Sequence, residues 1–348
     1  MERERIIGHL AILGKIFNQI AQKADWPGFD IGISQNEYRD IELLIKEAEK
    51  LNPWFTEDQT HHALSSWSKE LTHEKLSKWT DSYHYVDSDK KSVGVVMAGN
   101  IPLVGLHDLI SVLLSGHNII IRPSSDDHVL IRMVAAILSS LDNGYSERIR
   151  WADGKLKDFH AIIATGSNNT SRYFEHYFSK VPNVIRKNRN GIAILTGEEG
   201  ENELSALGKD IFQYFGLGCR NVSKIYIPED YDLDKFFGGI YSFNKIIEHN
   251  KYANNFDYYR SVFLLNADKI LENGFLLLKE SGDLASPMAS LHYERYQAKQ
   301  ELGGHLDSIS DQIQCIVSKE HIPFGMSQYP SLSDYADGVD TLKFLTEL

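Results

Sequence analysis

The sequence predicts an α/β protein built around a parallel sheet. From about residue 92, short β-branched segments alternate with apolar helical segments, which is the pattern of βαβ units. Several of these strands run directly into turns rich in glycine, serine or proline. The chain has 348 residues, of which 42% are hydrophobic and 24% charged, so it can build two ordinary globular domains.

Residues 1–80 are predicted to be helical. Apolar residues recur at helical spacing from Ile6 to Ile20. Two later helices carry the capping-box pattern, one at Ser34 and one at Thr56, in which each N-cap side chain satisfies an orphan backbone amide. The region is polar and contains no catalytic constellation, so we expect it to buttress the domain that follows.

The alternation of strands and helices divides the rest of the chain into two sections. We expect strands at residues 83–85, 92–97, 117–122, 159–164, 191–195, 223–227 and 314–317. Helices are expected at residues 103–114, 127–141 and 201–215. We find no internal repeat and no obvious flexible linker, so the domain boundaries must be inferred from the motifs below.

Composition excludes several classes of protein. A net charge of -12 argues against broad nucleic-acid binding, which needs a basic surface. Two cysteines make a disulfide scaffold implausible and favour a reducing compartment. The charged N-terminus does not suit a signal peptide, and charged or polar residues interrupt the apolar region 93–121 before it reaches membrane-spanning length. We expect a soluble, cytoplasmic protein with no membrane span.

Cys219 is the first candidate catalytic residue. It lies in a Gly-x-Gly-Cys turn between a predicted helix and a predicted strand, where a substrate could approach the backbone closely. The neighbouring Arg220 would favour the thiolate. An isolated intracellular cysteine is more often a small buried hydrophobe, and Cys315, within an apolar strand, fits that second interpretation.

Three polar junctions follow predicted strands. Asn100 lies in the turn after residues 92–97, where it is either an ordinary turn residue or a donor to an oxyanion. Residues 122–125 (Arg-Pro-Ser-Ser) and 165–167 (Thr-Gly-Ser) follow two further strands. Because ligands of open parallel sheets bind outside the carboxyl ends of the strands, both segments are candidate nucleotide contacts.

In this order, the motifs resemble the aldehyde dehydrogenase superfamily. They comprise the Asn-x-Pro turn, the basic-Pro-Ser segment, the Gly-Ser junction, the Gly-x-Cys turn and the late Pro-Phe-Gly loop at residues 323–325. Within the superfamily the chain resembles the acyl-CoA reductase family, which includes the fatty acid reductase subunit of bacterial bioluminescence. The matching segments are residues 97–102 (MAGNIP), 215–223 (FGLGCRNVS), 252–259 (YANNFDYY) and 330–341 (PSLSDYADGVDT).

The resemblance implies an aldehyde dehydrogenase-like fold. We therefore predict an N-terminal helical region (1–80), a Rossmann-type cofactor-binding domain (81–195, rejoined by 318–348) and an α/β catalytic domain (196–317). It implies reduction of an acyl-CoA thioester, of the fatty acyl type, to an aldehyde through a cysteine acyl-enzyme. Cys219 would be the nucleophile and Asn100 the oxyanion donor. The residues implied to line the cofactor site are Arg122, Ser124, Ser125, Gly166 and Ser167.

Two departures from the superfamily pattern refine this expectation. Hydrolytic members place a water-activating Glu upstream of the cysteine, whereas the corresponding turn here is Arg189-Asn190-Gly191. Without that base the acyl group should be exchanged with a thiol rather than hydrolysed. Ser125 stands where a Glu usually binds the ribose hydroxyls, which with Arg122 nearby favours NADPH over NADH. A smaller mismatch is Ser171, where a Gly is common.

Other residues have ordinary interpretations beside functional ones. Tyr252, Phe256 and Tyr258 could line a substrate pocket for an acyl chain or belong to the core. Glu198 and Glu199 are expected to be solvated charges at a helix start. The histidines show no ligand spacing, so we expect no metal site.

Two rival functions stay open. One is a reductase on the same fold that acts on an acyl phosphate, such as glutamyl phosphate, and the other is a non-catalytic scaffold. The resemblance also implies a homo-oligomer, with subunit contacts near residues 83–85, and leaves open an acyl-activating synthetase as partner. The acyl chain length and the pathway are not specified by the sequence.

Overall fold

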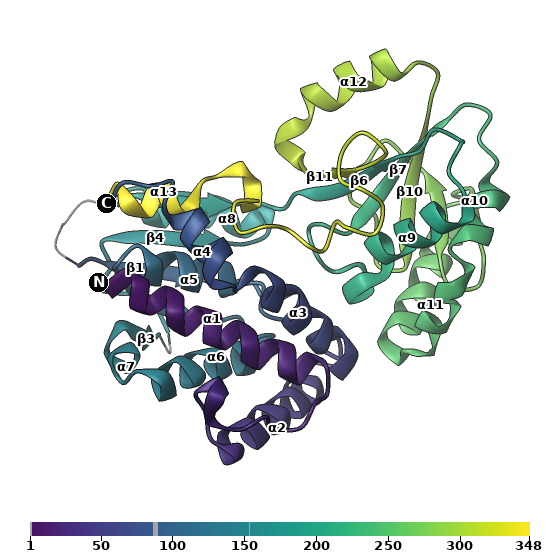
Figure 1. The fold of residues 1–348 in the computed structure, drawn as a ribbon. Helices are drawn as coiled ribbons and strands as arrows, with labels where there is room; N and C mark the ends of the chain where they lie inside the picture. The colour runs from purple at the N-terminus through teal and green to yellow at the C-terminus, as the bar shows by residue number, and fades with distance from the viewer. Residues whose placement is uncertain (1, 86–89, 153) are drawn as a thin grey trace. The chain divides into compact units, whose positions relative to one another are not determined.

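A computed structural model describes residues 2–85, 90–152 and 154–348 of the chain. The chain forms two compact units, each with its own sheet (Figure 1). Unit 1 comprises Met1–Lys187 and Ser331–Leu348, and unit 2 comprises Asn188–Pro330. Both combine a largely parallel sheet with helices, so the predicted α/β class is confirmed.

Unit 1 contains a five-stranded parallel sheet in the order β3-β2-β1-β4-β5. The strands are β1 (Ser92–Val96), β2 (Asn118–Arg122), β3 (Ile149–Trp151), β4 (Ala161–Thr165) and β5 (Asn183–Arg186). Strands β2 and β3 lie on one side of β1, and β4 and β5 lie on its other side. The topological switch point, where open parallel sheets bind ligands, therefore lies between β1 and β4.

The connections of this sheet are helical, as the βαβ pattern predicts. The helices are α5 (Leu106–Leu114), α6 (His128–Leu141), α7 (Gly144–Arg148) and α8 (Asn168–Phe178). Helix α5 is buried along nearly its whole length, and β2 has three consecutive isoleucines of which none is exposed. Strands covered on both faces have such continuous apolar runs, which explains why the sequence pattern is clear here.

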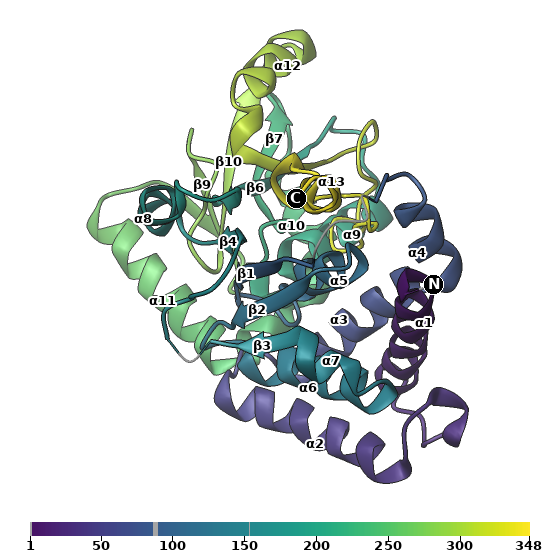
Figure 2. The ribbon, with the colours of Figure 1, turned by 90° about the vertical axis from the view of Figure 1, so that its left-hand side faces the viewer.

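The N-terminal helices belong to the same core as this sheet. They are α1 (Glu2–Ala21), η1 (Phe29–Ile31), α2 (Gln35–Leu51), α3 (Glu57–Glu70) and α4 (His73–Thr80). Helices α1 and α2 both contact α6 (Figure 2). The capping box of Ser34 is present with both of its hydrogen bonds, and the Thr56 side chain accepts from the Gln59 amide as expected.

The C-terminal segment returns to unit 1 through η5 (Ala336–Gly338) and α13 (Thr341–Thr346). Arg186 at the end of β5 donates two hydrogen bonds of 2.8 Å to the Asp108 carboxylate and one to Thr341 Oγ1.

Residues 83–85, which the structure describes, do not form the expected strand. Instead, the Tyr83 hydroxyl lies 2.6 Å from that of Tyr335 and donates to Asp340, so this segment is held by side chains.

Unit 2 contains a six-stranded sheet in the order β11-β6-β7-β10-β9-β8. Its strands are β6 (Asn190–Ile194), β7 (Val222–Pro228), β8 (Ile270–Glu272), β9 (Leu277–Glu280), β10 (Ser290–Tyr296) and β11 (Ile313–Val317). All the pairings are parallel except that of β8 with β9. The helices are α9 (Glu201–Phe212), η2 (Gln213–Gly216), α10 (Leu233–Gly239), η3 (Tyr241–Glu248), α11 (Asn250–Leu265), α12 (Lys299–Ser308) and η4 (Ser310–Gln312).

The boundaries between the units differ from the predicted ones. The prediction places β6 in the cofactor domain, but this strand lies between β11 and β7 in the sheet of unit 2. Unit 2 also continues to Pro330 rather than ending at residue 317. A buried strand is apolar whichever sheet receives it, so its sequence does not reveal its partners.

Candidate active site

Cys219 lies in the turn that joins η2 to β7 in unit 2. Its side chain is exposed, whereas Cys315 on β11 is buried, and neither cysteine forms a disulfide. The Cys315 thiol points toward the Arg220 carbonyl, with 3.6 Å between sulfur and oxygen. The two cysteines thus differ in solvent access, and of the two only Cys219 is exposed.

The backbone that leads into Cys219 is strained. Tyr214 and Phe215 adopt left-handed conformations with φ of 52° and 57°, and Gly216 follows with φ of 79°. For a residue other than glycine such a conformation costs about 1–3 kcal/mol. The two side chains are buried, with 5% and 8% of their surface exposed, so packing offsets the strain.

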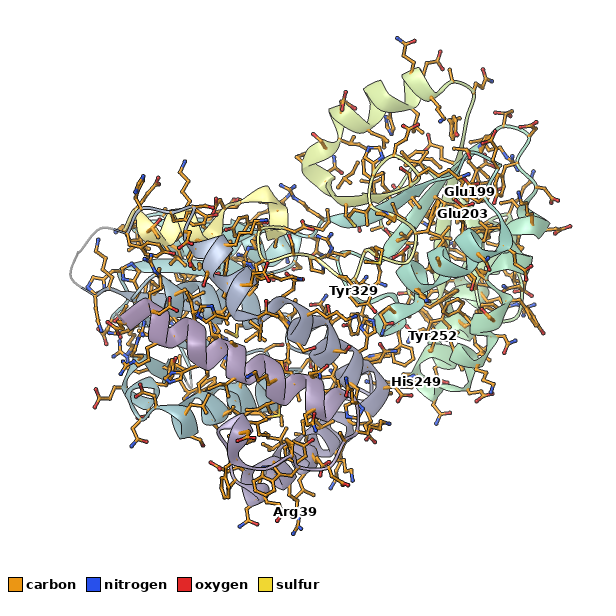
Figure 3. All side chains as sticks on the ribbon, viewed as in Figure 1. Arg39, Glu199, Glu203, His249, Tyr252 and Tyr329 are labelled. Carbon is orange, nitrogen blue, oxygen red and sulfur yellow. The ribbon has the colours of Figure 1, made fainter. Side chains whose placement is uncertain are left out.

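Aromatic side chains pack on Phe215, four residues before Cys219. The Phe215 ring centroid lies 4.3 Å from that of His249 and 6.3 Å from that of Tyr252. His249 caps α11 by accepting from the Tyr252 amide, and both residues stand at the beginning of that helix (Figure 3). The segment that leads into Cys219 is therefore packed, through Phe215, against the beginning of α11.

The aromatic residues expected to line a pocket do not share one environment. Tyr252 and Phe256 are buried on α11, 1% and 7% exposed, and the Tyr252 hydroxyl donates to the Phe275 carbonyl. Tyr258 is 61% exposed and packs edge-on against Tyr259. Because positions 252 and 256 are one helical turn apart and 258 is not, only the first two face the same side of α11.

The three polar junctions of unit 1 share one edge of its sheet. In the strand register Val96 pairs with both Arg122 and Ala164, so β1, β2 and β4 end side by side. Asn100 follows β1, residues 122–125 leave β2, and Gly166 follows β4. All the predicted cofactor residues are thus brought to the carboxyl edge at the switch point, where the fold provides a ligand site.

The junctions after β1 and β2 are in direct contact. A Cβ atom on Gly99 would lie 2.5 Å from the Ser124 Cβ and 3.1 Å from the Asp127 backbone nitrogen. Glycine is therefore required at position 99. Arg122, Ser125 and Asn100 are exposed at this edge, while Ser124 is half-buried.

Asp127 is a feature of this edge that sequence reasoning missed. Its carboxyl group is 5% exposed, and Oδ2 accepts a 2.7 Å hydrogen bond from the amide of Leu103, whose φ is 59°. Oδ1 has no partner among the described residues. Burial raises the pKa of the Asp127 carboxyl well above its usual range, although the hydrogen bond from Leu103 opposes this. Asp127 is the N-cap residue of α6 but makes no side-chain cap hydrogen bond, and no local pattern in the sequence points to its contact with Leu103.

The junction after β4 opens α8 with a capped N-terminus. The Ser167 hydroxyl accepts from the Thr170 amide at 3.2 Å, and a Cβ on Gly166 would lie 3.1 Å from the Thr170 side chain. Backbone amides at such a helix start favour an anionic group. Together with the glycine contact at position 99, this junction fits a dinucleotide at the switch point.

The acidic residues upstream of Cys219 are placed differently from expectation. Glu198 is exposed as predicted, but Glu199, which is labelled in Figure 3, is fully buried. The Glu199 carboxylate accepts from the Thr196 amide, the Thr196 hydroxyl and the Gly197 amide. Burial raises the pKa of Glu199, but these hydrogen bonds together outweigh burial and lower it. Glu199 is thus a structural acceptor that closes the loop before α9.

Two kinds of feature are missing from the described part of the chain. Over residues 2–85, 90–152 and 154–348, no group of three or more His, Cys, Asp or Glu side chains is placed to hold a metal ion. Over the same ranges, no helix combines the length and apolar character needed to cross a membrane.

Asn100 and Cys219 belong to different units. Their joint action on one substrate therefore stays a prediction, as do the roles assigned to the cofactor residues.

Known proteins resemble this chain in sequence and in fold. The family model of acyl-CoA reductase (LuxC) matches residues 70–174, and no curated protein sequence matches the chain. Aldehyde dehydrogenase 21 from Physcomitrella patens, in complex with the reaction product succinate, gives a TM-score of 0.66 at 11% identity, covering 99% of this chain and 83% of its own.

Other aldehyde dehydrogenases give similar values. For the NAD-dependent enzyme from Sinorhizobium meliloti the TM-score is 0.62 at 9% identity, with 91% of this chain and 70% of that chain covered. For the NAD+ complex of the Bacillus cereus enzyme it is 0.59 at 12% identity, with 91% and 72% covered. At these identities the likeness to the solved structures establishes the fold alone, and the family model matches less than a third of the chain. The chain therefore has the aldehyde dehydrogenase fold, and over residues 70–174 it is similar to the acyl-CoA reductase (LuxC) family.

Proposed function

We propose that this chain reduces the thioester of an acyl-CoA, of the fatty acyl type, to an aldehyde, with Cys219 as nucleophile and NADPH as hydride donor. The observation that carries the proposal is the contrast between the two cysteines. Cys219 is exposed in a glycine-flanked turn beside aromatic side chains, whereas Cys315 is buried in a strand. Only the first can accept an acyl group from a ligand in solution.

The first chemical step belongs to the protein's own residues. The Cys219 thiolate attacks the thioester carbonyl, a new carbon–sulfur bond forms, and the bond to the CoA sulfur breaks as CoA leaves as a thiolate. We assign the Asn100 side-chain amide and the Cys219 backbone amide as donors to the oxyanion that develops in this step. The product is a thioester on Cys219.

The cofactor site is assigned to the carboxyl edge of unit 1. Arg122, Ser124 and Ser125 would contact the adenosine ribose, and Gly166 with Ser167 would hold the phosphates at the start of α8. Ser125 leaves room for a 2′-phosphate where a carboxylate would repel it, and Arg122 supplies a positive charge at the same strand end. When bound, NADPH supplies the hydride that brings the acyl group to the aldehyde level.

The fate of the acyl group depends on the absence of a water-activating base. The segment at residues 189–191 carries no carboxylate. Glu199, a buried acid further along the chain, is committed to three hydrogen bonds with Thr196 and Gly197. Its carboxylate is therefore unsuited to activate water, which supports reduction over hydrolysis. Collapse of the thiohemiacetal on Cys219 then releases the aldehyde and restores the thiolate.

We also infer a cytoplasmic enzyme that works as a homo-oligomer and receives its acyl group as free acyl-CoA or from an acyl-activating synthetase. The reactive thiol of Cys219 suits a reducing compartment. The aromatic side chains of Phe215 and Tyr252, which pack together shortly before the Cys219 turn, suit an acyl chain better than the charged substrate of a glutamyl-phosphate reductase.

The test is oxidation of NADPH by the full chain in the presence of acyl-CoAs from acetyl to palmitoyl, with Cys219→Ala and Cys315→Ala beside the wild type. We expect turnover that peaks at one chain length, is lost in Cys219→Ala and persists in Cys315→Ala. Loss in Cys315→Ala alone would overturn the assignment of the nucleophile. Turnover with an acyl phosphate but with no CoA ester would instead identify the acyl-phosphate reductase, and NADPH binding without any turnover would identify a scaffold.

A further inference from the structure

The two residues that follow Cys219 are anchored within unit 2 by separate contacts. The Asn221 amide donates to the Gly218 carbonyl at 3.0 Å, so Cys219 and Arg220 are the central residues of a β-turn. The turn is closed a second time by the Asn221 side chain, whose Oδ1 accepts from the Gly218 amide at 2.8 Å. Asn221 is only 3% exposed, so this second closure is shielded from water.

The same side chain also caps the end of α9. Asn221 Nδ2 donates to the carbonyls of Asp210 at 3.0 Å, Ile211 at 3.3 Å and Gln213 at 2.8 Å. The last carbonyls of a helix have no partner within the helix, and a buried helix end needs such donors. One amide group therefore joins the Cys219 turn to the end of α9.

Asp210 extends this connection to the loop after β11. Its side chain is 1% exposed; Oδ2 accepts from the Gly325 amide at 2.6 Å and Oδ1 accepts from the Ser327 amide at 2.9 Å. The loop then returns to the turn, because Arg220 Nε donates to the Ser327 carbonyl at 2.6 Å. These hydrogen bonds form a closed cycle. Asn221 binds Asp210, Asp210 binds Ser327, and Ser327 binds Arg220, which precedes Asn221 in the Cys219 turn.

We propose that this closed cycle of hydrogen bonds sets the position of the Cys219 thiol, and that Asn221 is its principal positioning residue. The inference rests on the proposed role of Cys219 as the nucleophile. A turn entered through the strained residues Tyr214 and Phe215 would relax if its exit were loose, and the cycle prevents this by anchoring positions 220 and 221. Nucleophilic attack is sensitive to such displacement, since an error of about 1 Å can cost roughly 10²-fold in rate.

The test compares two reactions of the same thiol in the full chain. In the absence of NADPH, palmitoyl-CoA acylates Cys219 in a single turnover, which requires a positioned carbonyl, whereas iodoacetamide alkylates it without one. For Asn221→Ala we expect acylation to slow by roughly 10²-fold while alkylation changes by less than about threefold. Unchanged acylation would overturn the inference, and so would an equal fall in both rates, since that indicates general loss of the thiol rather than loss of its position.

A matched control separates positioning from stability. Asn273 in the same unit accepts from the amides of Phe275 and Leu276, and these bonds lie outside the cycle. Asn273→Ala should lower the melting temperature while acylation stays within about threefold of the wild type. If Asn273→Ala slows acylation as much as Asn221→Ala does, the role of Asn221 is structural only.

A milder variant covers the case in which Asn221→Ala does not fold. Arg220→Met keeps the apolar stem and removes the Nε donor to Ser327, so it opens the cycle at a different point. Because Arg220 is also expected to favour the thiolate, alkylation should slow as well, and we expect acylation to slow by roughly tenfold more than alkylation does. Acylation at the wild-type rate in Arg220→Met would refute the cycle. If the wild type itself is not acylated at Cys219 by any acyl-CoA, the proposed function is wrong, and the positioning role of Asn221 is wrong with it. If the wild type and the variants are acylated at equal rates, only the positioning role is wrong.

Discussion

The carboxyl edge of unit 1 and the Cys219 turn of unit 2 are held in place in different ways. At the edge, three parallel strands end in register, and short junctions with glycine and serine lead into helices. At the turn, consecutive left-handed residues precede the cysteine, and buried polar side chains hold the residues after it. The sheet edge is thus formed by the strand topology alone, whereas the conformation of the turn depends on hydrogen bonds between residues far apart in the chain.

The largest expected effect concerns the stability of unit 1. Asp108→Ala removes the carboxylate from a buried bidentate pair in which Asp108 is 3% and Arg186 6% exposed. Breaking one side of such a pair costs about 3–5 kcal/mol, because a buried charge loses its counter-ion. Urea unfolding should show this loss for the variant. A change below about 1 kcal/mol would mean that the edge of unit 1 does not depend on the pair.

The next effect concerns catalysis at the exposed edge. Asn100→Ala should lose about 2.7–4 kcal/mol of transition-state stabilisation, as for other oxyanion donors, seen as a fall in kcat with palmitoyl-CoA. Because Asn100 is exposed, its replacement should leave the unfolding free energy within about 0.5 kcal/mol of the wild type. Full activity in Asn100→Ala would mean that Asn100 is an ordinary turn residue and not an oxyanion donor.

A glycine that packs against the backbone of the Cys219 turn tests how firmly the turn is held. A Cβ on Gly191 of β6 would lie 2.6 Å from the Asn221 carbonyl oxygen and 2.8 Å from that of Arg220. Gly191→Ala should therefore cost about 1–3 kcal/mol through overpacking and slow the acylation of Cys219. The control is Gly8→Ala on α1, where a Cβ meets nothing within 4 Å and a gain of about 0.5–1 kcal/mol is expected. Normal acylation in Gly191→Ala would show that the turn tolerates displacement.

Cofactor preference tests the chemistry of the unit 1 edge. Ser125→Glu places a carboxylate where we assign the 2′-phosphate, and like-charge repulsion should lower kcat/KM for NADPH relative to NADH by roughly tenfold or more. Ser125→Gln, of equal size but uncharged, serves as the control and should retain the wild-type preference. If the preference for NADPH over NADH is unchanged in both variants, Ser125 does not contact the cofactor.

The smallest effect is a change in the pH dependence of stability. Because burial raises the pKa of Asp127 above its unfolded value, the folded chain binds more protons than the unfolded chain between the two values. The contribution of Asp127 is therefore most favourable at low pH and is lost as the pH rises from about 4 through the folded pKa. Asp127→Asn keeps an acceptor for the Leu103 amide and removes this loss, so it should be more stable than the wild type at pH 7 in urea unfolding measured over a pH series. Lower stability at pH 7 would mean that the ionised carboxylate is required.

Much of the fold and part of the site could be predicted from local patterns. The β-branched runs at β1, β2 and β4 and the helices between them follow from periodicity, because burial on both faces imposes an apolar sequence. The polar junctions after these strands could be assigned to one edge of the sheet from the sequence alone, since parallel strands end on the same side. The prediction that Glu199 is a solvated charge at a helix start was wrong. Its burial depends on a loop that turns its carboxylate toward Thr196 and Gly197.

Local sequence was enough to assign the α/β class, the order of most elements, and Cys219, Asn100 and the strand-end junctions as candidates, because these depend on neighbours within a few residues. Long-range packing was needed to place β6 in the second sheet, to turn Tyr258 toward solvent, and to bring Asp127 to the Leu103 amide. It also brings Asn221 to the point where the Cys219 turn meets α9. Strand partners and buried hydrogen bonds connect residues far apart in the chain, and no local pattern records which of several possible partners a side chain meets.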